Sequence, residues 1–277
     1  MGKVQKRIFI GVIAFFMLLC IGFLLTPQIS NWIYTMQSRE VIEEYSNVVS
    51  AMDEDELDNY IEEAKSYNEY LYNGSLGDSD LVYEDMLNFN DSGQMGIVVI
   101  PKIGVNLPIY HSVDDDVLHE GAGHMPESSL PIGGVNTHSV ISAHTAQPGR
   151  VFFDDLPKLE EGDIFYISVL GEKMYYKVIN SEVVEPDDLS LLEIEDDKDL
   201  ASLLTCYPYA VNTHRLIVTG ERVLNNEVEV VEEEITPVET TNYGLIIGIV
   251  AGVIILAVLF IVCLLYTSPS PRDRSVS

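Results

Sequence analysis

Two apolar runs stand near the two ends of the chain, and the spacing of apolar residues changes once between them. Residues 8–25 form a run of 18 residues without a charged side chain, and residues 244–266 form one of 23. A helix needs about 20 residues to cross a bilayer core of ~30 Å, so both runs predict membrane-spanning helices. No small-residue cleavage site follows the first run, which favours an uncleaved anchor over a signal peptide.

After the first run, apolar side chains recur every three or four residues as far as residue 72, and this spacing predicts two helices. Asp53 is expected to cap the second helix, and Gly74 to follow its end. The plain interpretation of the pair is a stalk that packs on a folded domain and spaces it from the membrane. Residues 74–94 are polar and rich in Gly and Asp, so they predict a loop, either a linker or a mobile cover over a site.

From residue 95 the pattern changes to short runs of β-branched and aromatic residues separated by Pro, Gly, Asn and Asp. Regular short strands with few helices favour a closed or partly closed β-barrel. The expected strands are residues 95–101, 106–111, 138–144, 163–170, 173–184, 202–206 and 214–223. Residues 187–200 predict a short helix and a loop.

These patterns divide the chain into five parts. They are an N-terminal tail and anchor (1–27), a helical stalk with a polar loop (28–94), a β-barrel domain (95–224), an acidic linker (225–242) and a C-terminal span with its tail (243–277). The linker has little apolar surface to bury, which is typical of a segment without a fold of its own.

Charge sets the expected orientation of these parts and excludes some partners. The chain carries −29 overall, but residues 28–243 hold ten basic and 43 acidic residues, a formal charge of −33. Basic tails on the cytoplasmic side and a long acidic domain outside agree with the positive-inside rule. Such an acidic domain is not expected to bind nucleic acid or an anionic membrane surface, which leaves proteins or cell-wall material as partners.

Cys206 is the one cysteine outside the apolar runs, because Cys20 and Cys263 fall inside them. An unpaired thiol in an extracytoplasmic domain has no disulfide partner in its own chain. It is therefore either buried and inert or kept because it reacts, and position alone does not choose between the two.

His144 is the best candidate for a base beside this thiol. A thiol attacks carbonyl groups as its thiolate, so it needs a base or a cation nearby. His144 ends the expected strand 138–144 and precedes a turn, where a side chain can face a cleft. His138 lies on the same face, but ~20 Å away at ~3.3 Å per residue, so the two histidines cannot share one thiol.

Other polar residues receive weaker interpretations. His214 neighbours Arg215 on one strand and therefore points to the opposite face. His119 and His124 lie in an expected loop and are interpreted as solvated surface. The run of Asp114, Asp115 and Asp116 is interpreted as a solvated turn, and since the chain has neither HExxH nor CxxC, no metal site is expected.

The sequence leaves two possible roles for the side chain of Arg215. In so acidic a domain it could form a surface salt bridge. Alternatively, it is a fixed cation near the thiol that holds the substrate carbonyl or stabilises a tetrahedral oxyanion. If residues 202–206 and 214–223 are adjacent antiparallel strands, Cys206 and Arg215 face each other at their ends.

At these residues the chain resembles the sortases. SLLTC at residues 202–206, followed nine residues later by Arg215, is similar to the TLxTC…R signature of that family, with Ser202 keeping the hydroxyl of the first position. HSVISAHT resembles the family's histidine strand, and IPKIGVNLPIYH with GAGHMPESSLPIGG resembles its class C, pilus-assembling branch. The resemblance covers residues 40–224, and a second membrane span after the barrel also suits class C.

The resemblance implies a mainly β fold, an eight-stranded sortase barrel with N-terminal helices, flanked by two transmembrane helices. It also implies a transpeptidase in the cell membrane of a Gram-positive-type bacterium, with its catalytic domain outside and no cofactor. The thiolate would cleave an LPxTG-like sorting signal between Thr and Gly, and a lysine amine of a neighbouring pilin would resolve the thioester. The residues carried over are Cys206 as nucleophile, His144 as general acid and base, Arg215 as the cation, and Leu203 and Thr205 as substrate contacts.

One departure from class C concerns the lid, an Asp-Pro-aromatic segment that covers the thiol in that branch. The corresponding stretch here, LGDSDLVYEDM, has no Asp-Pro. Asp78 or Asp80 would supply the acidic part of a lid and Tyr83 the aromatic part.

Two other functions stay open. One is a sortase that attaches surface proteins to peptidoglycan, and the other is a non-catalytic pilus docking module on the same barrel. A papain-type protease is disfavoured, because no CGSCW-like context surrounds Cys206 and the pattern is that of a β fold.

Overall fold

A computed structural model describes residues 3–74, 82–89, 92–223 and 252. The helices are α1 (Lys3–Ala51), α2 (Glu54–Asn73) and α3 (Asp115–Glu120), with single 3-10 turns η1 (Tyr83–Asp85), η2 (Pro101–Ile103), η3 (Leu156–Lys158) and η4 (Ser190–Leu192). The strands are β1 (Gln94–Ile100), β2 (Val105–His111), β3 (Ala122–His124), β4 (Thr137–Ser142), β5 (Ile164–Val169), β6 (Glu172–Val184), β7 (Asp199–Tyr207) and β8 (His214–Arg222).

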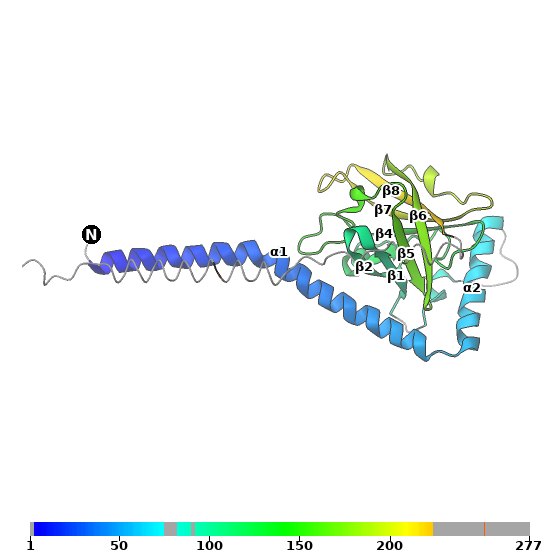
Figure 1. Ribbon diagram of the computed structural model, residues 1–277, viewed down its shortest axis with the longest axis horizontal. Coiled ribbons are helices and arrows are strands. Elements are labelled where there is room, and N and C mark those ends of the chain that lie inside the picture. The colour runs from blue at the N-terminus through cyan, green and yellow to red at the C-terminus, as the bar shows by residue number, and fades with distance from the viewer. Residues whose placement is uncertain (1–2, 75–81, 90–91, 224–251, 253–277) are drawn as a thin grey trace, which may run out of the picture. The chain divides into compact units, whose positions relative to one another are not determined.

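The eight strands close into one barrel in the order β1-β2-β3-β4-β7-β8-β6-β5, which confirms the mainly β fold and the barrel (Figure 1). Each of the seven strands expected from alternation is present. The eighth, β3, was not expected because its three residues, Ala-Gly-His, are too few to show a period. It pairs in parallel with β2 and antiparallel with β4, so long-range pairing alone defines it.

The acidic stretch before β7 also differs from expectation. Residues 187–200 were expected to hold a short helix, but the only helical turn in that described stretch is η4, three residues long. The last two residues of the stretch already belong to β7.

α1 is continuous through Pro27, so the expected anchor and the first stalk helix are one element. Within the described residues, it is the one helix long and apolar enough to cross a membrane, with a mean hydropathy of 2.3 in its most apolar window and none of that window buried. Apart from Gly252, the second expected span, residues 244–266, lies outside the described residues, as does the acidic linker. The part of α1 before residue 30 belongs to a different compact unit from the barrel, which lies with the rest of α1 in the unit Ser30–Val238.

α2 begins and ends where its capping residues predict. Asp53 accepts a hydrogen bond from the amide of Glu56 at 2.9 Å, and Glu56 accepts one from the amide of Asp53 at 3.3 Å, which makes a reciprocal capping box. At the other end Gly74 adopts a φ of 67°, a conformation that glycine takes at little cost. The face of α2 that carries Ala64, Tyr67 and Asn68 is buried against the barrel.

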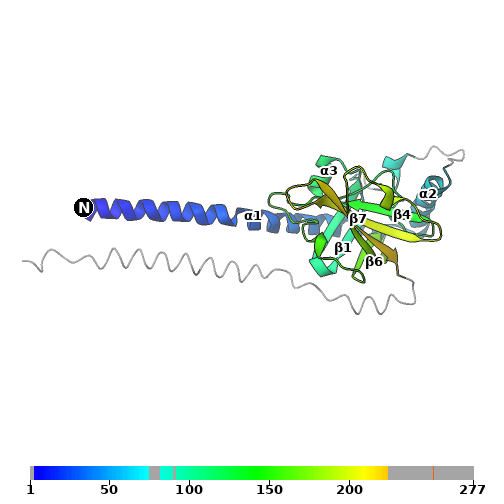
Figure 2. The ribbon, with the colours of Figure 1, turned by 90° about the horizontal axis from the view of Figure 1, so that it is seen from above.

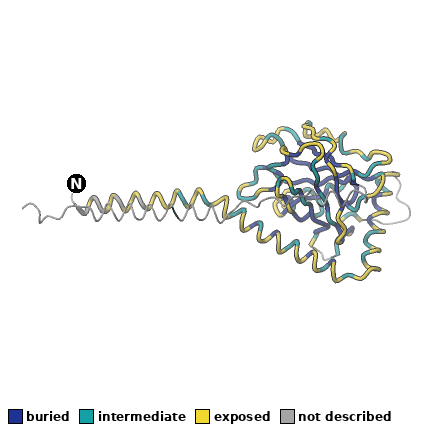
Figure 3. Tube along the Cα trace, in the orientation of Figure 1, coloured by how far each residue is buried: buried dark blue, intermediate teal, exposed yellow. Residues whose placement is uncertain are grey.

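The residues of the main core come from the barrel strands and from the helices that pack on them, and the strands carry most of the buried positions (Figure 3). The second half of α1 is joined to the barrel by Tyr45, whose hydroxyl donates to the carbonyl of Met95 and accepts from the amide of Leu170, both at 3.0 Å. Asn68 of α2 makes a paired bond with the backbone of Leu130, at 3.1 and 2.7 Å. Seen from above, α2 and α3 cover different parts of the circumference (Figure 2).

His124 shows that one sequence interpretation was wrong: it is not solvated surface but fully buried in β3. Its Nε2 donates to the carbonyl of Ser129 at 2.8 Å, and its Nδ1 accepts from the hydroxyl of Tyr83 at 2.9 Å. Burial lowers the pKa of His124 to about 4, since a charged imidazole would lose its water. The neutral ring therefore ties η1 to the barrel.

This histidine makes the fold sensitive to acid. The unfolded chain binds a proton at His124 near its ordinary pKa of ~6.5, whereas the folded chain does so only near pH 4. Stability is therefore lost as pH falls from ~6.5 to ~4, by up to about 3 kcal/mol from this group. Urea unfolding of the full chain in detergent, followed by circular dichroism at pH 7 and pH 4.5, should show a smaller pH effect for His124→Asn than for wild type. His214→Gln, an exposed histidine, should follow wild type, and equal pH effects in all three chains would contradict this assignment.

Candidate active site

The predicted catalytic residues lie on one outer face of the barrel, formed by β4, β7 and β8. On these strands, Ile141, Leu203 and Leu216 belong to the main core inside the barrel. Their sequence neighbours Val140, Leu204 and Ile217 point to the other side of the sheet and form a separate small cluster outside the barrel. Side chains two residues apart on a strand point to the same face. Cys206 lies two residues after Leu204, and Arg215 lies two residues before Ile217, so both side chains belong to this outer face.

Strand register brings the thiol and the cation together. β7 and β8 are adjacent and antiparallel, and Cys206 is the direct partner of Arg215. β4 runs parallel to β7 with Ser142 opposite Leu204, and continuing this register by two residues brings His144 level with Cys206. All three side chains are half-buried, so they are accessible from solvent; Cys206 and Arg215 lie in strands, and His144 lies just beyond the end of β4.

The backbone around His144 is fixed by several hydrogen bonds. The hydroxyl of Thr205 donates to the carbonyl of Ala143 at 2.7 Å, and the amide of Phe153 donates to the carbonyl of His144 at 3.1 Å. The carboxylate of Asp154 accepts from the amides of Ala146 and Phe152 at 3.0 and 2.9 Å, which closes the loop after the histidine. His144 is therefore presented by a rigid loop although it lies beyond the end of β4.

The electrostatic setting of His144 favours its neutral form. Burial lowers its pKa, nearby His119 lowers it further, and Asp115 opposes both. A neutral imidazole can take a proton from a thiol, and the resulting imidazolium can give it to a leaving amine. The site is therefore equipped for general acid and base chemistry beside a nucleophile.

Arg215 behaves as an available cation. Its guanidinium donates to the carbonyl of His214 at 3.0 Å and to that of Asn212 at 3.5 Å. None of the ion pairs found within the described parts of the chain involves Arg215, so the alternative of a surface salt bridge finds no acidic partner there. His214 points away to the other face, where it lies 3.5 Å from Glu185.

Leu203 and Thr205, the expected substrate contacts, are both buried. Leu203 lies in the main core, and Thr205 uses its hydroxyl on the carbonyl of Ala143. Their contacts are to the barrel itself, so from these positions they support the strand that carries Cys206.

Of the expected lid residues, Asp78 and Asp80 lie outside the described residues. Tyr83 is described and is held in η1 against β3, where its ring stacks on that of His124 with 5.7 Å between centroids. Its hydroxyl also accepts from the amide of Ser112 at 3.3 Å. Burial raises the pKa of Tyr83, so the phenol remains neutral.

Two polar contacts at the site went unrecognised in the sequence. Ser202 bonds to Nε2 of His138 and to the hydroxyl of Thr219, both at 2.8 Å, so the hydroxyl of the first signature position joins three strands. His119 lies in α3 with its ring against that of His144. Only pairing between distant segments reveals either contact, so no local pattern signals them.

A cavity of about 410 Å³ lies on the same outer face as Cys206. It shares Val140 with the small outer cluster, and the remaining lining comes mostly from apolar residues of α2 and of the segment around η4. An extended peptide placed over β4 and β7 would find an apolar recess here.

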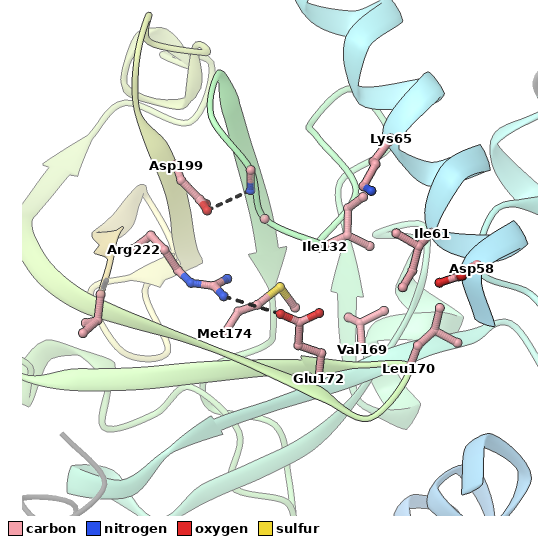
Figure 4. Close-up of a pocket in the computed structure, with 13 residues that line it drawn as sticks. Asp58, Ile61, Lys65, Ile132, Val169, Leu170, Glu172, Met174, Asp199 and Arg222 are labelled. Carbon is pink, nitrogen blue, oxygen red and sulfur yellow. Dashed lines mark hydrogen bonds and ion pairs between the residues drawn. The ribbon is translucent and has the colours of Figure 1, made fainter. Parts of the chain in front are cut away.

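A second cavity, of about 880 Å³ (Figure 4), has lining residues at the end of the barrel opposite Cys206. It is lined by Asp199, which begins β7, and by Arg222, which ends β8, whereas Cys206 and Arg215 lie at the opposite ends of these strands. Asp199 accepts from the amide of Gly134 at 2.8 Å and from Tyr176 at 3.2 Å. The Asp199 carboxylate is thus occupied by neighbouring groups, at the opposite end of β7 from the thiol.

The comparisons with known proteins agree with this geometry. A family model described as the Sortase domain matches residues 98–223. The chain is similar to sortase C from Clostridium perfringens, solved with the C-terminal cell wall sorting motif, at 42% identity over 67% of this chain and 98% of that one, with a TM-score of 0.61. It is also similar to sortase C from Streptococcus pneumoniae, whose structure was reported to bear on pilin substrate specificity, at 38% identity over 67% and 97% of the two chains, with a TM-score of 0.60.

A curated relative matches over a shorter stretch. Sortase D of Bacillus subtilis is 32% identical over 137 residues, which is 48% of this chain and 66%, just under two thirds, of that protein. The solved structures, in contrast, are covered almost completely and at higher identity. The chain therefore belongs to the sortases, a family of cysteine transpeptidases, and within them to class C.

Proposed function

We propose that the chain is a membrane-anchored transpeptidase that cleaves an LPxTG-like sorting signal and joins it to a lysine amine of a pilin subunit. The observation that carries this proposal is the pairing of Cys206 with Arg215 across β7 and β8, with His144 level with them on the same exposed face. A thiol, a base and a cation on one face are what acyl transfer through a thioester requires.

In the first half-reaction, His144 takes the proton of the Cys206 thiol, and the thiolate attacks the carbonyl carbon of the signal's Thr. The tetrahedral oxyanion lies within reach of the Arg215 guanidinium, which stabilises the new negative charge. The C–N bond to Gly then breaks as His144 gives its proton to the departing amine. The acyl group remains on Cys206 as a thioester.

In the second half-reaction, the lysine amine of the acceptor attacks the thioester carbonyl. His144 accepts the proton that the amine loses, and the C–S bond breaks as an isopeptide bond forms. The thiol of Cys206 is restored, so the cycle consumes no cofactor. The apolar recess beside Val140 would hold an apolar side chain of the signal and keep the peptide extended over β7.

Support for the choice of substrate comes from two relatives. The Clostridium perfringens enzyme was solved with a cell wall sorting motif, and the Streptococcus pneumoniae structure concerns pilin substrates. Support for membrane anchoring comes from the apolar first part of α1 and from the contrast between basic tails and an acidic domain. With basic tails inside, the catalytic domain would lie outside a Gram-positive-type cell.

The proposal is tested with the full chain in lipid nanodiscs, an LPxTG peptide, and either a lysine-bearing pilin or a peptidoglycan-like amine. We expect mass spectrometry to show an acyl-enzyme at Cys206 and an isopeptide product with the pilin at least ~10-fold faster than with the other amine. Preference for the peptidoglycan-like amine would indicate wall anchoring instead. If neither thioester nor product formed, the docking-module alternative would replace the enzyme.

A further inference from the structure

The ring of His144 has one close side-chain neighbour that no motif assigns. His119 meets it edge to face, with ring centroids 5.4 Å apart and an angle of 86° between the planes. No hydrogen bond to the His144 ring was found from any residue that the structure describes. A base that works with a nucleophile is commonly oriented by a third group, and here none of the described carboxylates does this by hydrogen bonding.

The fold delivers His119 to this place through β3. Gly123 of β3 pairs with Ser142 of β4 in an antiparallel ladder, so the chain just before β3 runs beside the residues just after β4. α3 ends there, one residue before β3, and Leu118 is its buried anchor. The end of α3 is also tied to α1, because the hydroxyl of Tyr34 donates to the carbonyl of Glu120 at 3.0 Å.

The orientation of the His119 ring is set within α3. Its Nδ1 bonds to the backbone carbonyl of Asp115, one turn earlier. A carbonyl can only accept, so Nδ1 carries the proton and the ring cannot flip without losing this bond. The side chain is otherwise exposed, and it contributes nothing to the main core that would explain its position.

We propose that His119 is a positioning residue for His144, holding the imidazole in a fixed orientation on the outer face that carries Cys206. This inference rests on the proposed function, because it assumes that His144 is the acid and base of the reaction. The edge-to-face contact limits the rotation of the His144 ring, as such contacts do between aromatic rings.

The electrostatics around His144 agree with this role. After burial, His119 is the largest cause that lowers the pKa of His144, and Asp115, from the same helix, raises it. Cys206 of β7 and Arg215 of β8 share the face, and Asp154 binds backbone amides in the following loop. Removing His119 should therefore raise the pKa of His144, whereas removing the Asp115 carboxylate should lower it.

Two variants of the full chain separate the ring from the charge. His119→Gln removes the ring, and we expect kcat for LPxTG peptide cleavage to fall about 10-fold with KM changed less than about twofold, because a misplaced base affects the chemical step. His119→Phe keeps a ring edge without a charge, so most of the activity should return. In both variants the pKa of His144, measured by NMR of its labelled ring, should rise.

Asp115→Asn is the matched comparison. The hydrogen bond from His119 goes to the backbone carbonyl of residue 115, so it survives the change of side chain. Its His144 pKa should move down, opposite to the histidine variants. His214→Gln, an exposed histidine on the other face of β8, should change neither quantity.

Wild-type kcat in His119→Gln, or equal losses in His119→Gln and His119→Phe, would overturn the inference, because the ring contact would then be irrelevant. The proposed function fails separately, if His144→Ala retains wild-type turnover or if wild type forms no thioester. The NMR shifts are measured without substrate, so they show in either case whether His119 acts on the His144 ring.

Discussion

Cys206→Ala is expected to abolish thioester formation and to lower sorting-signal cleavage at least ~10⁴-fold. In the proposed mechanism the sulfur is the atom that becomes acylated, and no other described group on the outer face of β7 can replace it as a nucleophile of similar strength. The loss should appear in kcat, because the peptide can still bind along the strand. Cleavage of a quenched fluorescent LPxTG peptide by the full chain, with mass spectrometry of the intact protein, measures both effects.

The chain provides a matched control for this variant. Cys20 is also a free thiol, exposed on α1. Cys20→Ala should leave cleavage and acylation unchanged, whereas labelling of the unfolded chain with a thiol reagent should fall by one site in each variant. Residual cleavage in Cys206→Ala within about 100-fold of wild type would mean that the nucleophile has been misassigned.

The second large effect is expected at Arg215. Arg215→Ala should lower kcat by about 10²–10³, the loss found when one group that stabilises an oxyanion is removed. The guanidinium is held by the carbonyls of His214 and Asn212, and Cys206 is its partner across the ladder, so the cation is already in place when negative charge develops. Arg215→Lys restores the charge but not the planar set of N–H donors, so its kcat should lie between that of Arg215→Ala and that of wild type.

Arg222 is the control, since it lies on the same strand at the other pole of the barrel, where its guanidinium stands over the ring of Tyr176 at 5.7 Å. Arg222→Lys should keep kcat within about twofold of wild type, because charges at that distance are screened. A kcat for Arg215→Ala within about threefold of wild type would show that the arginine only binds the peptide or plays no part.

Local patterns in the sequence were sufficient for much of this protein. Alternation located seven of the eight strands, and Asp53 and Gly74 marked the ends of α2, because these signals depend on residues within one turn or strand of each other. The expectation that His214 and Arg215 point to opposite faces is also local, because it depends only on their being adjacent in one strand. A motif of closely spaced residues, SLLTC with Arg215, led to the sortase family for the same reason.

Long-range pairing decided the rest. β3 is too short for a period, and His124 was misread as surface because the burial of a histidine depends on what packs over it. The contact of His119 with His144 exists only because β3 pairs with β4, a relation that the residues near either histidine do not encode. The sequence by itself thus predicted seven of the eight strands, the ends of α2, and a thiol, a base and a cation as the candidate site. Only the closed barrel decided which side chains meet, since register between distant strands is set by the packing of the whole core.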